Sequence, residues 1–358
     1  MKKIIAFVLI MTSMLVLSGC NRGPVLNVLN WSYYISEDLV AKFEEEFNVR
    51  VVIDPVDTNE AMYAKINAKT TNFDIAIPSD YMVHKLKEGL LMELDFDKLP
   101  NYASNKFDTK LEEMRDDYFE GNQNYAVPYF WGSLGIMYND RVNGLGTLIE
   151  EHEWEVFFNP QLTNDLKVTM YNSSRDEIAT AQLYLGYNLN EVTTAQLTEI
   201  ETLLKAQNYF AWGADNLKEM VAVGNADIAL VYSGDFFDML YASMEDEDEI
   251  LYNMIVPNDN NIWFDAMVIP TTAQNTDLAH EFINFMLEHE NAYENAQAIG
   301  YCPPLTSAYQ AMLSNEDYTD VITTYPYYPG TITNGMVYRD LGHDMYQKME
   351  LLLNNVKG

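Results

Sequence analysis

The chain has 358 residues and a formal net charge of −33 at pH 7, with 54 acidic residues against 21 basic ones. Hydrophobic residues make up 48% of it, including 25 Tyr, 16 Phe and 5 Trp, which is enough to fill the cores of two ordinary domains. Such an acidic surface confers solubility, attracts small cations and repels nucleic acid, which we therefore exclude as a partner.

The first 20 residues have the pattern of an export signal. A Met-Lys-Lys start precedes an apolar run over 4–17, and the segment closes with Leu-Ser-Gly-Cys at Cys20. The apolar run is too short for a comfortable membrane span, and no later stretch is long and apolar enough. The ending resembles the bacterial lipoprotein box, which implies a signal peptide over 1–19, lipid on Cys20 and a tether over 20–24. The rest would then lie outside the cytoplasmic membrane, on the periplasmic or cell-wall side, held by lipid alone.

Cysteine and histidine are too scarce for a disulfide-rich or metal-bound fold. Apart from Cys20 the sequence holds only Cys302, and the five His are scattered. A single unpaired cysteine argues against a disulfide framework, and the scatter argues against a Cys/His metal site. We therefore expect neither a metal nor another cofactor.

The N-terminal region alternates strands and helices, as a parallel α/β sheet does. We expect strands over 25–31, 49–54 and 73–78, and helices over 36–47, over 59–68 and from residue 79 or 80. Ser36 is placed to cap the first helix. Ligands of such sheets bind at the carboxyl ends of the strands. Those ends are Asn30 to Tyr34 and Pro78 to Tyr81, and each combines an aromatic residue, a hydroxyl and a helix start.

A second α/β region follows a loop-rich section over 98–124. An extended aromatic segment over 125–133 contains Pro128 and Gly132, which indicate a crossover between two lobes, and leads into a strand over 134–138. Beyond it we expect strands over 167–171, 226–232 and 261–270, and helices over 176–187, 194–205, 214–223, 278–288, 291–300 and 344–356. The predicted fold is α/β, with two lobes and a ligand cleft between them.

The strand expected over 261–270, N-I-W-F-D-A-M-V-I-P, sets Trp263 and Asp265 two residues apart, so both side chains point to the same face. A carboxylate on a buried strand is costly to desolvate unless a cation arrives, and the Asp charge and the Trp ring would hold that cation together. The alternative is a buried Asp satisfied by backbone amides or an Arg. This stretch alone leaves both interpretations open.

Six segments between residues 30 and 304 carry a family resemblance. They are N-W-S-Y-Y (30–34), D-T-N-E-A-M-Y-A-K (57–65), F-D-I-A-I-P-S-D-Y (73–81), V-P-Y-F-W-G (127–132), I-W-F-D-A-M-V-I-P (262–270) and A-I-G-Y-C-P-P (298–304). Together they resemble the bacterial extracellular polyamine-binding proteins, the spermidine and putrescine receptors of ABC importers in the periplasmic-binding-protein type II superfamily. The resemblance covers nearly all of the mature chain. It implies a monomeric receptor that captures a polyamine and delivers it to the permease subunits of an ABC importer.

The resemblance also implies a set of ligand-binding residues. The positions that match the family's cleft aromatics, hydroxyls and amine-binding acid are Trp31, Ser32, Tyr34, Ser79, Tyr81, Trp263, Asp265 and Tyr301. In the family the Trp on the strand stacks on the ligand and the Asp binds an amine. Aromatic walls suit the methylenes and cationic faces of a polyamine, and carboxylates fix its nitrogens. Each aromatic residue could instead belong to the core.

The chain departs from the family's pattern at several of these positions. Spermidine receptors carry an Asp where Ser173 aligns and a Glu where Asp176 aligns, so one acid of that pair is missing. The expected cleft Trp is Tyr232, and an expected Gln aligns with Tyr338. These changes weaken the case for a third ammonium.

A further acid favours a short diamine. The segment V-Y-S-G-D ends at Asp235 and resembles the W-A-G-D segment of putrescine-selective members. A pair of Asp235 and Asp265 would grip a diamine, which predicts a preference for putrescine or near-equal binding of putrescine and spermidine. The alternative is that Asp235 caps the helix that follows.

Three other functions remain to be weighed. No recognisable nucleophile, base and orienting group occur together, and no carboxylate pair has glycosidase spacing, so we do not expect an enzyme. A receptor of the same fold for thiamine or ferric iron is the main alternative. Paired tyrosines in Y-P-Y-Y (325–328) would suit iron, whereas the strand with Trp263 and Asp265 would not. A structural or adhesive surface lipoprotein is the third.

The expected lobes are discontinuous in sequence. We predict crossovers near 131–133, 260–263 and 311–315, because closure of two lobes needs such hinges. The first lobe would then comprise 24–131 and 263–312. The second would comprise 132–262 and 313–358.

Replacing the lipid-bearing residue should separate the anchor from the receptor. We predict that Cys20→Ser releases a folded protein into the soluble fraction, because the tether contributes nothing to the cleft. Fractionation of cells with a salt wash measures this. Persistent membrane association of the variant would show that the lipoprotein assignment is wrong.

Overall fold

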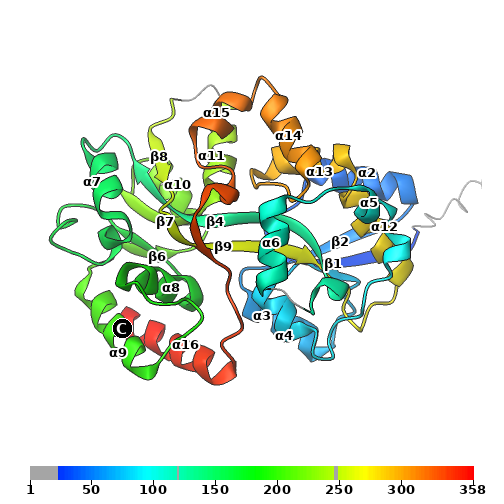
Figure 1. The fold of residues 1–358 in the computed structure, drawn as a ribbon, viewed down its shortest axis with the longest axis horizontal. Coiled ribbons are helices and arrows are strands. Elements are labelled where there is room, and N and C mark those ends of the chain that lie inside the picture. The colour runs from blue at the N-terminus through cyan, green and yellow to red at the C-terminus, as the bar shows by residue number, and fades with distance from the viewer. Residues whose placement is uncertain (1–22, 119–120, 246–248) are drawn as a thin grey trace, which may run out of the picture.

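Two long strands, β4 (Val127–Asn139) and β9 (Asp259–Met267), run antiparallel through the middle of the molecule and connect two lobes (Figure 1). The structure is a computed structural model that describes residues 23–118, 121–245 and 249–358. The predicted signal peptide and Cys20 lie outside these residues. Strand β4 runs without a break over 13 residues, all of them buried, so the expected extended segment and the strand after it form one element.

The first lobe is built on the expected parallel sheet, in the order β2-β1-β3. Its strands are β1 (Val25–Trp31), β2 (Arg50–Val56) and β3 (Ile75–Ala76), and its helices include α2 (Glu37–Phe47), α3 (Asn59–Ala68), α4 (Asp80–Leu86), α12 (Thr276–Met286) and α13 (His289–Ile299). Ser36 caps α2 as predicted, with its Oγ accepting from Leu39 N at 3.4 Å. Strand β3 is shorter than the strand expected over 73–78, although Asp74 N and Ile77 N on either side of it still donate to carbonyl oxygens of β1.

The second lobe surrounds the other half of β4. Strands β7 (Ile228–Tyr232) and β8 (Tyr252–Ile255) pair antiparallel with β4, β10 (Asn334–Met336) pairs parallel with β9, and β5 (Thr169–Tyr171) pairs parallel with β6 (Ala211–Gly213). Its helices include α7 (Leu145–His152), α8 (Ser174–Leu185), α9 (Thr194–Ala206), α10 (Asn216–Ala222), α11 (Ser233–Glu245) and α16 (His343–Lys357). The expected strands and helices of this region are confirmed, with shifted ends.

The section over 98–124, expected to be rich in loops, contains two helices that were not predicted, α5 (Pro100–Ser104) and α6 (Thr109–Tyr118). Leu111 and Met114, three residues apart, turn one side of α6 into the core, and polar residues around them hide this short apolar stripe in the sequence. The remaining elements are α14 (Thr306–Ser314), α15 (Thr319–Thr324) and the 3₁₀ turns η1 (Phe96–Lys98), η2 (Gln123–Tyr125), η3 (Glu153–Phe157) and η4 (Pro329–Thr331). In the described part of the chain, no helix has the length and apolar character needed to cross a bilayer.

A wholly buried carboxylate fastens the first lobe. Asp74 precedes β3, and its Oδ2 accepts from Asn27 N in β1 at 2.9 Å. Its Oδ1 accepts from the backbone N–H groups of Gln274 and Asn275, at 2.9 and 2.8 Å, just before α12. Three backbone donors from distant parts of the sequence thus depend on one side chain.

Asp74→Asn should lower the free energy of unfolding by about 2–4 kcal/mol, because hydrogen bonds to a charged acceptor are lost and buried N–H groups lose their partner. Urea denaturation measures this loss. The exposed Asp97 provides the control, and Asp97→Asn should stay within about 0.5 kcal/mol of the native chain. Equal stability of the two variants would contradict the role given to Asp74.

Candidate functional site

Strand β9 presents its Trp and Asp to the space between the lobes. Trp263 and Asp265 lie on the same face and are 7% and 5% exposed. The backbone of Asp265 bridges to Ser79, at the start of α4, so the carboxylate lies beside the carboxyl end of the first-lobe sheet. This juxtaposition was expected from the strand ends.

One carboxylate oxygen of Asp265 lacks the protein partner that a merely structural acid would have. Within the described residues, its Oδ1 has no hydrogen-bond donor. Burial raises the pKa of Asp265 to about 7, and the neighbouring hydroxyls of Ser79 and Tyr34 oppose that rise. The alternative of an Asp satisfied by backbone amides or an Arg is therefore not supported. Retaining a buried acid in this state is typical of a functional site.

Other buried polar atoms of the predicted site residues also have no partner in the described part of the chain. They are the Nε1 atoms of Trp31 and Trp263 and the hydroxyl of Tyr34. Trp31 ends β1, and Tyr34 follows in the turn, where Tyr33 has φ 52° and points outward with 94% of its surface exposed. The left-handed backbone at Tyr33 thus lies in the turn that places the buried Tyr34 at the carboxyl end of β1.

A row of aromatic rings leads away from Asp265. Tyr34 lies 5.2 Å from Tyr301 between ring centroids, Tyr301 lies 5.4 Å from Trp263, and Trp263 lies 5.6 Å from Tyr232. Steep interplanar angles of 63° to 82° make all three contacts edge-to-face. The row crosses from the first lobe to the end of β7 in the second.

A second acid lies at the far end of this row. Asp176 is 5% exposed; its Oδ2 accepts from the Tyr232 hydroxyl at 2.7 Å and its Oδ1 from the Tyr338 hydroxyl at 3.0 Å. Ser173, where the family carries an acid, is the N-cap of α8 and accepts from Asp176 N. The guanidinium of Arg175 lies 3.7 Å from the centroid of the Tyr338 ring. Tyr232 and Tyr338, which replace the Trp and Gln expected from the family, therefore both donate to Asp176 at this end of the row.

Asp235 differs from both, because protein donors already surround it. Its Oδ1 accepts from the Tyr301 hydroxyl at 3.1 Å and pairs with Lys218 Nζ at 3.3 Å. Its Oδ2 accepts weakly from Tyr232 N at 3.4 Å. Asp235 is the third residue of α11, so it reaches back to the start of the helix without being its N-cap residue.

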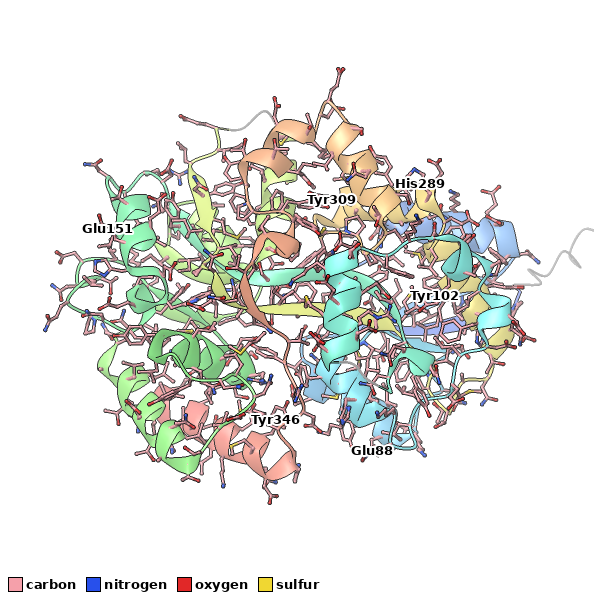
Figure 2. All side chains as sticks on the ribbon, in the orientation of Figure 1. Glu88, Tyr102, Glu151, His289, Tyr309 and Tyr346 are labelled. Atoms are coloured by element: carbon pink, nitrogen blue, oxygen red, sulfur yellow. The ribbon has the colours of Figure 1, made fainter. Side chains whose placement is uncertain are left out.

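The remaining predicted residues line the first-lobe side. Ser79 and Asn59 exchange two hydrogen bonds of 3.1 Å, and the Tyr81 hydroxyl donates to Glu60 Oε1 at 3.4 Å. Ser32 lies half-buried in the turn after β1. Tyr81 also faces the second lobe across 6.3 Å to Tyr346, which Figure 2 labels on α16. The structure thus brings the predicted residues into one region between the lobes.

Residues 38–329 match the profile of the bacterial extracellular solute-binding proteins. The chain belongs to this family.

Relatives in sequence and structure agree with this assignment. The putrescine-binding periplasmic protein SpuD of Pseudomonas aeruginosa is 33% identical over 278 residues, which cover 75% of each chain. The spermidine/putrescine-binding periplasmic protein of Salmonella typhimurium is 30% identical over 341 residues, or 92% of each. A putative spermidine/putrescine ABC transporter from Listeria monocytogenes aligns with a TM-score of 0.76 and 35% identity, over 93% of this chain and 98% of that one. The predicted two-lobe periplasmic-binding-protein type II fold is confirmed.

Two glycines allow the aromatic row of this solute-binding protein to form. A Cβ on Gly132 would lie 2.6 Å from Cζ2 of Trp263, and a Cβ on Gly234 would overlap the ring of Tyr301. Backbone and ring could not approach so closely with any larger residue. The glycine expected to mark the crossover in β4 therefore also shapes the site.

Several residues of the site escaped prediction. Asp80 was predicted only as the start of a helix. It is 2% exposed, and its Oδ2 accepts from Phe264 N at 3.1 Å. Burial raises the pKa of Asp80 to about 8. Lys218 lies on α10, whose sequence shows no signal for a site, and Arg175 was not singled out although it directly precedes the predicted Asp176. Asn59 lies in a recognised segment, but only the fold shows that it positions Ser79.

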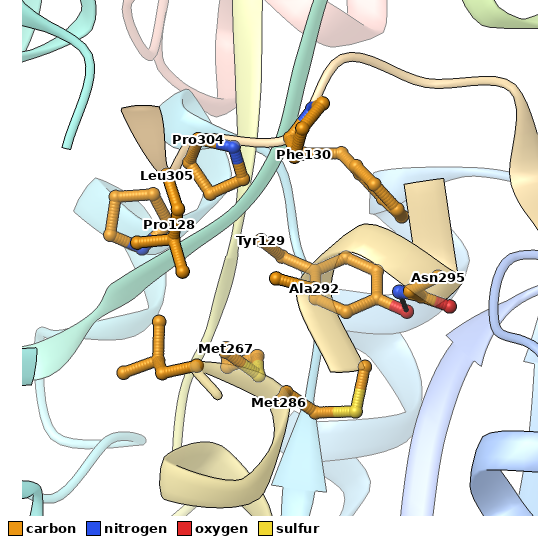
Figure 3. Close-up of a pocket in the computed structure, with 11 residues that line it drawn as sticks. Pro128, Tyr129, Phe130, Met267, Met286, Ala292, Asn295, Pro304 and Leu305 are labelled. Carbon is orange, nitrogen blue, oxygen red and sulfur yellow. Dashed lines mark hydrogen bonds between the residues drawn. The ribbon is translucent and has the colours of Figure 1, made fainter. Parts of the chain in front are cut away.

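The cavity shown in Figure 3 is separate from the candidate site. It is lined by Tyr129, Phe130 and Asn295 among others and encloses about 10 Å³, the space of one water molecule. Tyr129, which lines it, donates to the carbonyl oxygen of Tyr34 at 2.7 Å and accepts from Asn295 Nδ2 at 2.9 Å. This wall supports the turn that carries Tyr34 and is too small to hold a solute.

The tyrosines that suit iron do not form a pair of free ligands. The Tyr327 hydroxyl donates to the carbonyl oxygen of Tyr301 at 2.9 Å, and the Tyr328 hydroxyl donates to Asp108 Oδ2 at 2.8 Å. These separate structural bonds argue against an iron site there.

Asp265→Asn should stabilise the ligand-free protein, and more so at pH 8 than at pH 4. The pKa of about 7 in the folded state exceeds the ordinary value of 3.8, so the folded state holds the proton more tightly and stability falls as pH rises between these values. An amide has no charge to desolvate. We expect its advantage in unfolding free energy to grow by roughly 2–4 kcal/mol over this range, measured by urea denaturation.

The control for this measurement is Asp259→Asn, which removes an exposed acid from the same strand. Its effect should not vary with pH in the same way. A pH-independent effect of Asp265→Asn would contradict the account of a buried, protonatable carboxyl.

Proposed function

We propose that this solute-binding protein captures a polyamine, putrescine or spermidine, outside the cytoplasmic membrane and delivers it to an ABC importer. The observation that carries the proposal is Asp265, a buried acid whose Oδ1 has no donor in the described chain, at the start of an aromatic row that ends at Asp176. The relatives from Pseudomonas aeruginosa and Salmonella typhimurium, a putrescine-binding and a spermidine/putrescine-binding periplasmic protein, support the same ligand class.

The chemistry of the row suits an aliphatic chain with an ammonium at each end. One ammonium would lie against Asp265, where Trp263 and Tyr34 offer ring faces or edges and the Ser79 hydroxyl supports the carboxylate. The methylenes would pass along Tyr301 and Trp263. Aromatic side chains cover such a chain without demanding hydrogen bonds that it cannot make.

The other ammonium would lie near Asp176. A carboxylate has about four lone-pair directions, so the two tyrosine hydroxyls on Asp176 leave acceptor capacity for a ligand nitrogen. Trp31, Ser32 and Tyr81 would complete the wall on the first-lobe side. Asp235 contributes to the same region but is already paired with Lys218.

The lobes and their attachments complete the proposal. Residues 24–131 with 263–312 and 132–262 with 313–358 would move as two bodies around β4, β9 and a third crossover near 311–315, at the end of α14. The permease subunits of the importer would recognise the closed form. Lipid on Cys20 would keep the receptor, as a monomer, beside the membrane.

Calorimetric titration with putrescine, spermidine, thiamine and ferric iron tests the proposed function. We expect binding of one or both polyamines. Asp265→Asn should weaken polyamine binding by about 100-fold or more, because it leaves a buried ammonium without its carboxylate. Trp263→Leu should lose roughly 1–2 kcal/mol of cation–π stabilisation in addition to packing.

Trp212→Leu provides the matched control, because Trp212 is a partly buried indole in the second lobe that packs on Tyr209, outside the aromatic row. Its affinity for polyamines should be that of the native chain. Absence of polyamine binding to the native chain would overturn the function. Binding of thiamine or iron in its place would favour the alternative receptor.

A further inference from the structure

The protein carries an ammonium of its own beside the aromatic row. Lys218, on α10, places Nζ 3.3 Å from Asp235 Oδ1 and 2.8 Å from Asp238 Oδ2, both on α11. The side chains of Lys218 and Asp235 are 13% and 9% exposed, whereas that of Asp238 is 46% exposed. The pair with Asp235 is therefore the more deeply buried of the two.

The surroundings of Lys218 keep it charged. Burial alone would lower the pKa of Lys218, but the acids Asp235, Asp238 and Asp215 outweigh burial and raise it. Asp215 also accepts a hydrogen bond from the Tyr171 hydroxyl, through its Oδ1 at 3.2 Å. An ammonium that contacts two acids and lies in the field of a third remains a cation throughout the physiological pH range.

Asp235 and Asp265 consequently differ in how much hydrogen-bond acceptor capacity they have left for a ligand. Asp235 accepts from an ammonium and a tyrosine hydroxyl on one oxygen and from a backbone N–H on the other, whereas Asp265 Oδ1 has no donor among the described residues. The Tyr301 hydroxyl on Asp235 belongs to a ring of the aromatic row, so Asp235 adjoins the path proposed for the ligand. An ammonium arriving there would meet Lys218 as a like charge.

We propose that Lys218 is a specificity-determining residue: its ammonium neutralises Asp235 and confines the ammonium groups of a bound polyamine to Asp265 and Asp176. This inference rests on the proposed function and deepens it. It replaces the expectation that Asp235 and Asp265 together grip a diamine. The lysine acts as an internal substitute for the second ammonium of putrescine.

Lys218→Met tests the inference, because it removes the ammonium and keeps much of the side-chain volume. Calorimetric titration should show putrescine binding tightened by about tenfold or more, since Asp235 gains a free acceptor and a like charge is removed. Adding Asp235→Asn to this variant should abolish the gain. Lys205→Met, which removes an exposed lysine from α9, has the same effect on net charge and should leave the affinity unchanged.

The native chain provides a second test that does not depend on the folding of a variant. A crystal structure with putrescine should show Lys218 Nζ still in contact with Asp235 and a ligand nitrogen on Asp265. A ligand nitrogen bound directly to Asp235, or unchanged putrescine affinity in a folded Lys218→Met variant, would overturn the inference while leaving polyamine binding intact. Failure of the native chain to bind any polyamine would instead overturn the proposed function.

Discussion

The antiparallel pairing of β4 with β9 is the interaction on which the rest of the structure depends. These strands belong to both lobes, and their paired segment, residues 127–133 with 262–267, lies at the passage between them. The same segment carries Trp263 and Asp265, so the strands that connect the lobes also hold the central side chains of the site. A displacement of one lobe relative to the other must therefore bend or twist the ribbon at the place where a ligand would be held.

The buried acids in and around the site differ in whether protein donors already occupy both of their carboxylate oxygens. Asp74 and Asp235 each accept from protein donors on both carboxylate oxygens, the first within one lobe and the second beside the site. Asp265 remains without a donor on one oxygen in the described chain, and burial raises its pKa. Folding stability is thereby lowered at the point where binding needs an available charge.

The sequence predicted the parallel sheet of the first lobe and the gathering of its strand ends, because hydrophobic periodicity and strand–helix alternation are local signals. It also placed Trp263 and Asp265 on one face, since a strand alternates with period two. It did not find α6, whose apolar stripe has only Leu111 and Met114 within a polar helix. A stripe so narrow has almost no periodic signal.

Residues that act through long-range contacts could not be predicted. Lys218 is 17 residues before Asp235 and on another helix, and nothing in the sequence around it distinguishes it from a surface lysine. Tyr338 lies 162 residues after Asp176 and was placed beside it only through the family resemblance. Such pairs depend on how distant segments of the chain pack together, which the local sequence pattern of neither segment contains.

The raised pKa of Asp265 has a consequence for the stoichiometry of capture. With a pKa of about 7, the carboxyl in the ligand-free protein carries a proton in a substantial fraction of molecules at neutral pH. An ammonium that binds against the carboxylate must displace this proton, so the uptake of one positive charge is partly balanced by the release of another. Capture at this end of the site is then an ion exchange, and the acidity of the medium outside the cell enters the binding equilibrium as a competitor of the solute.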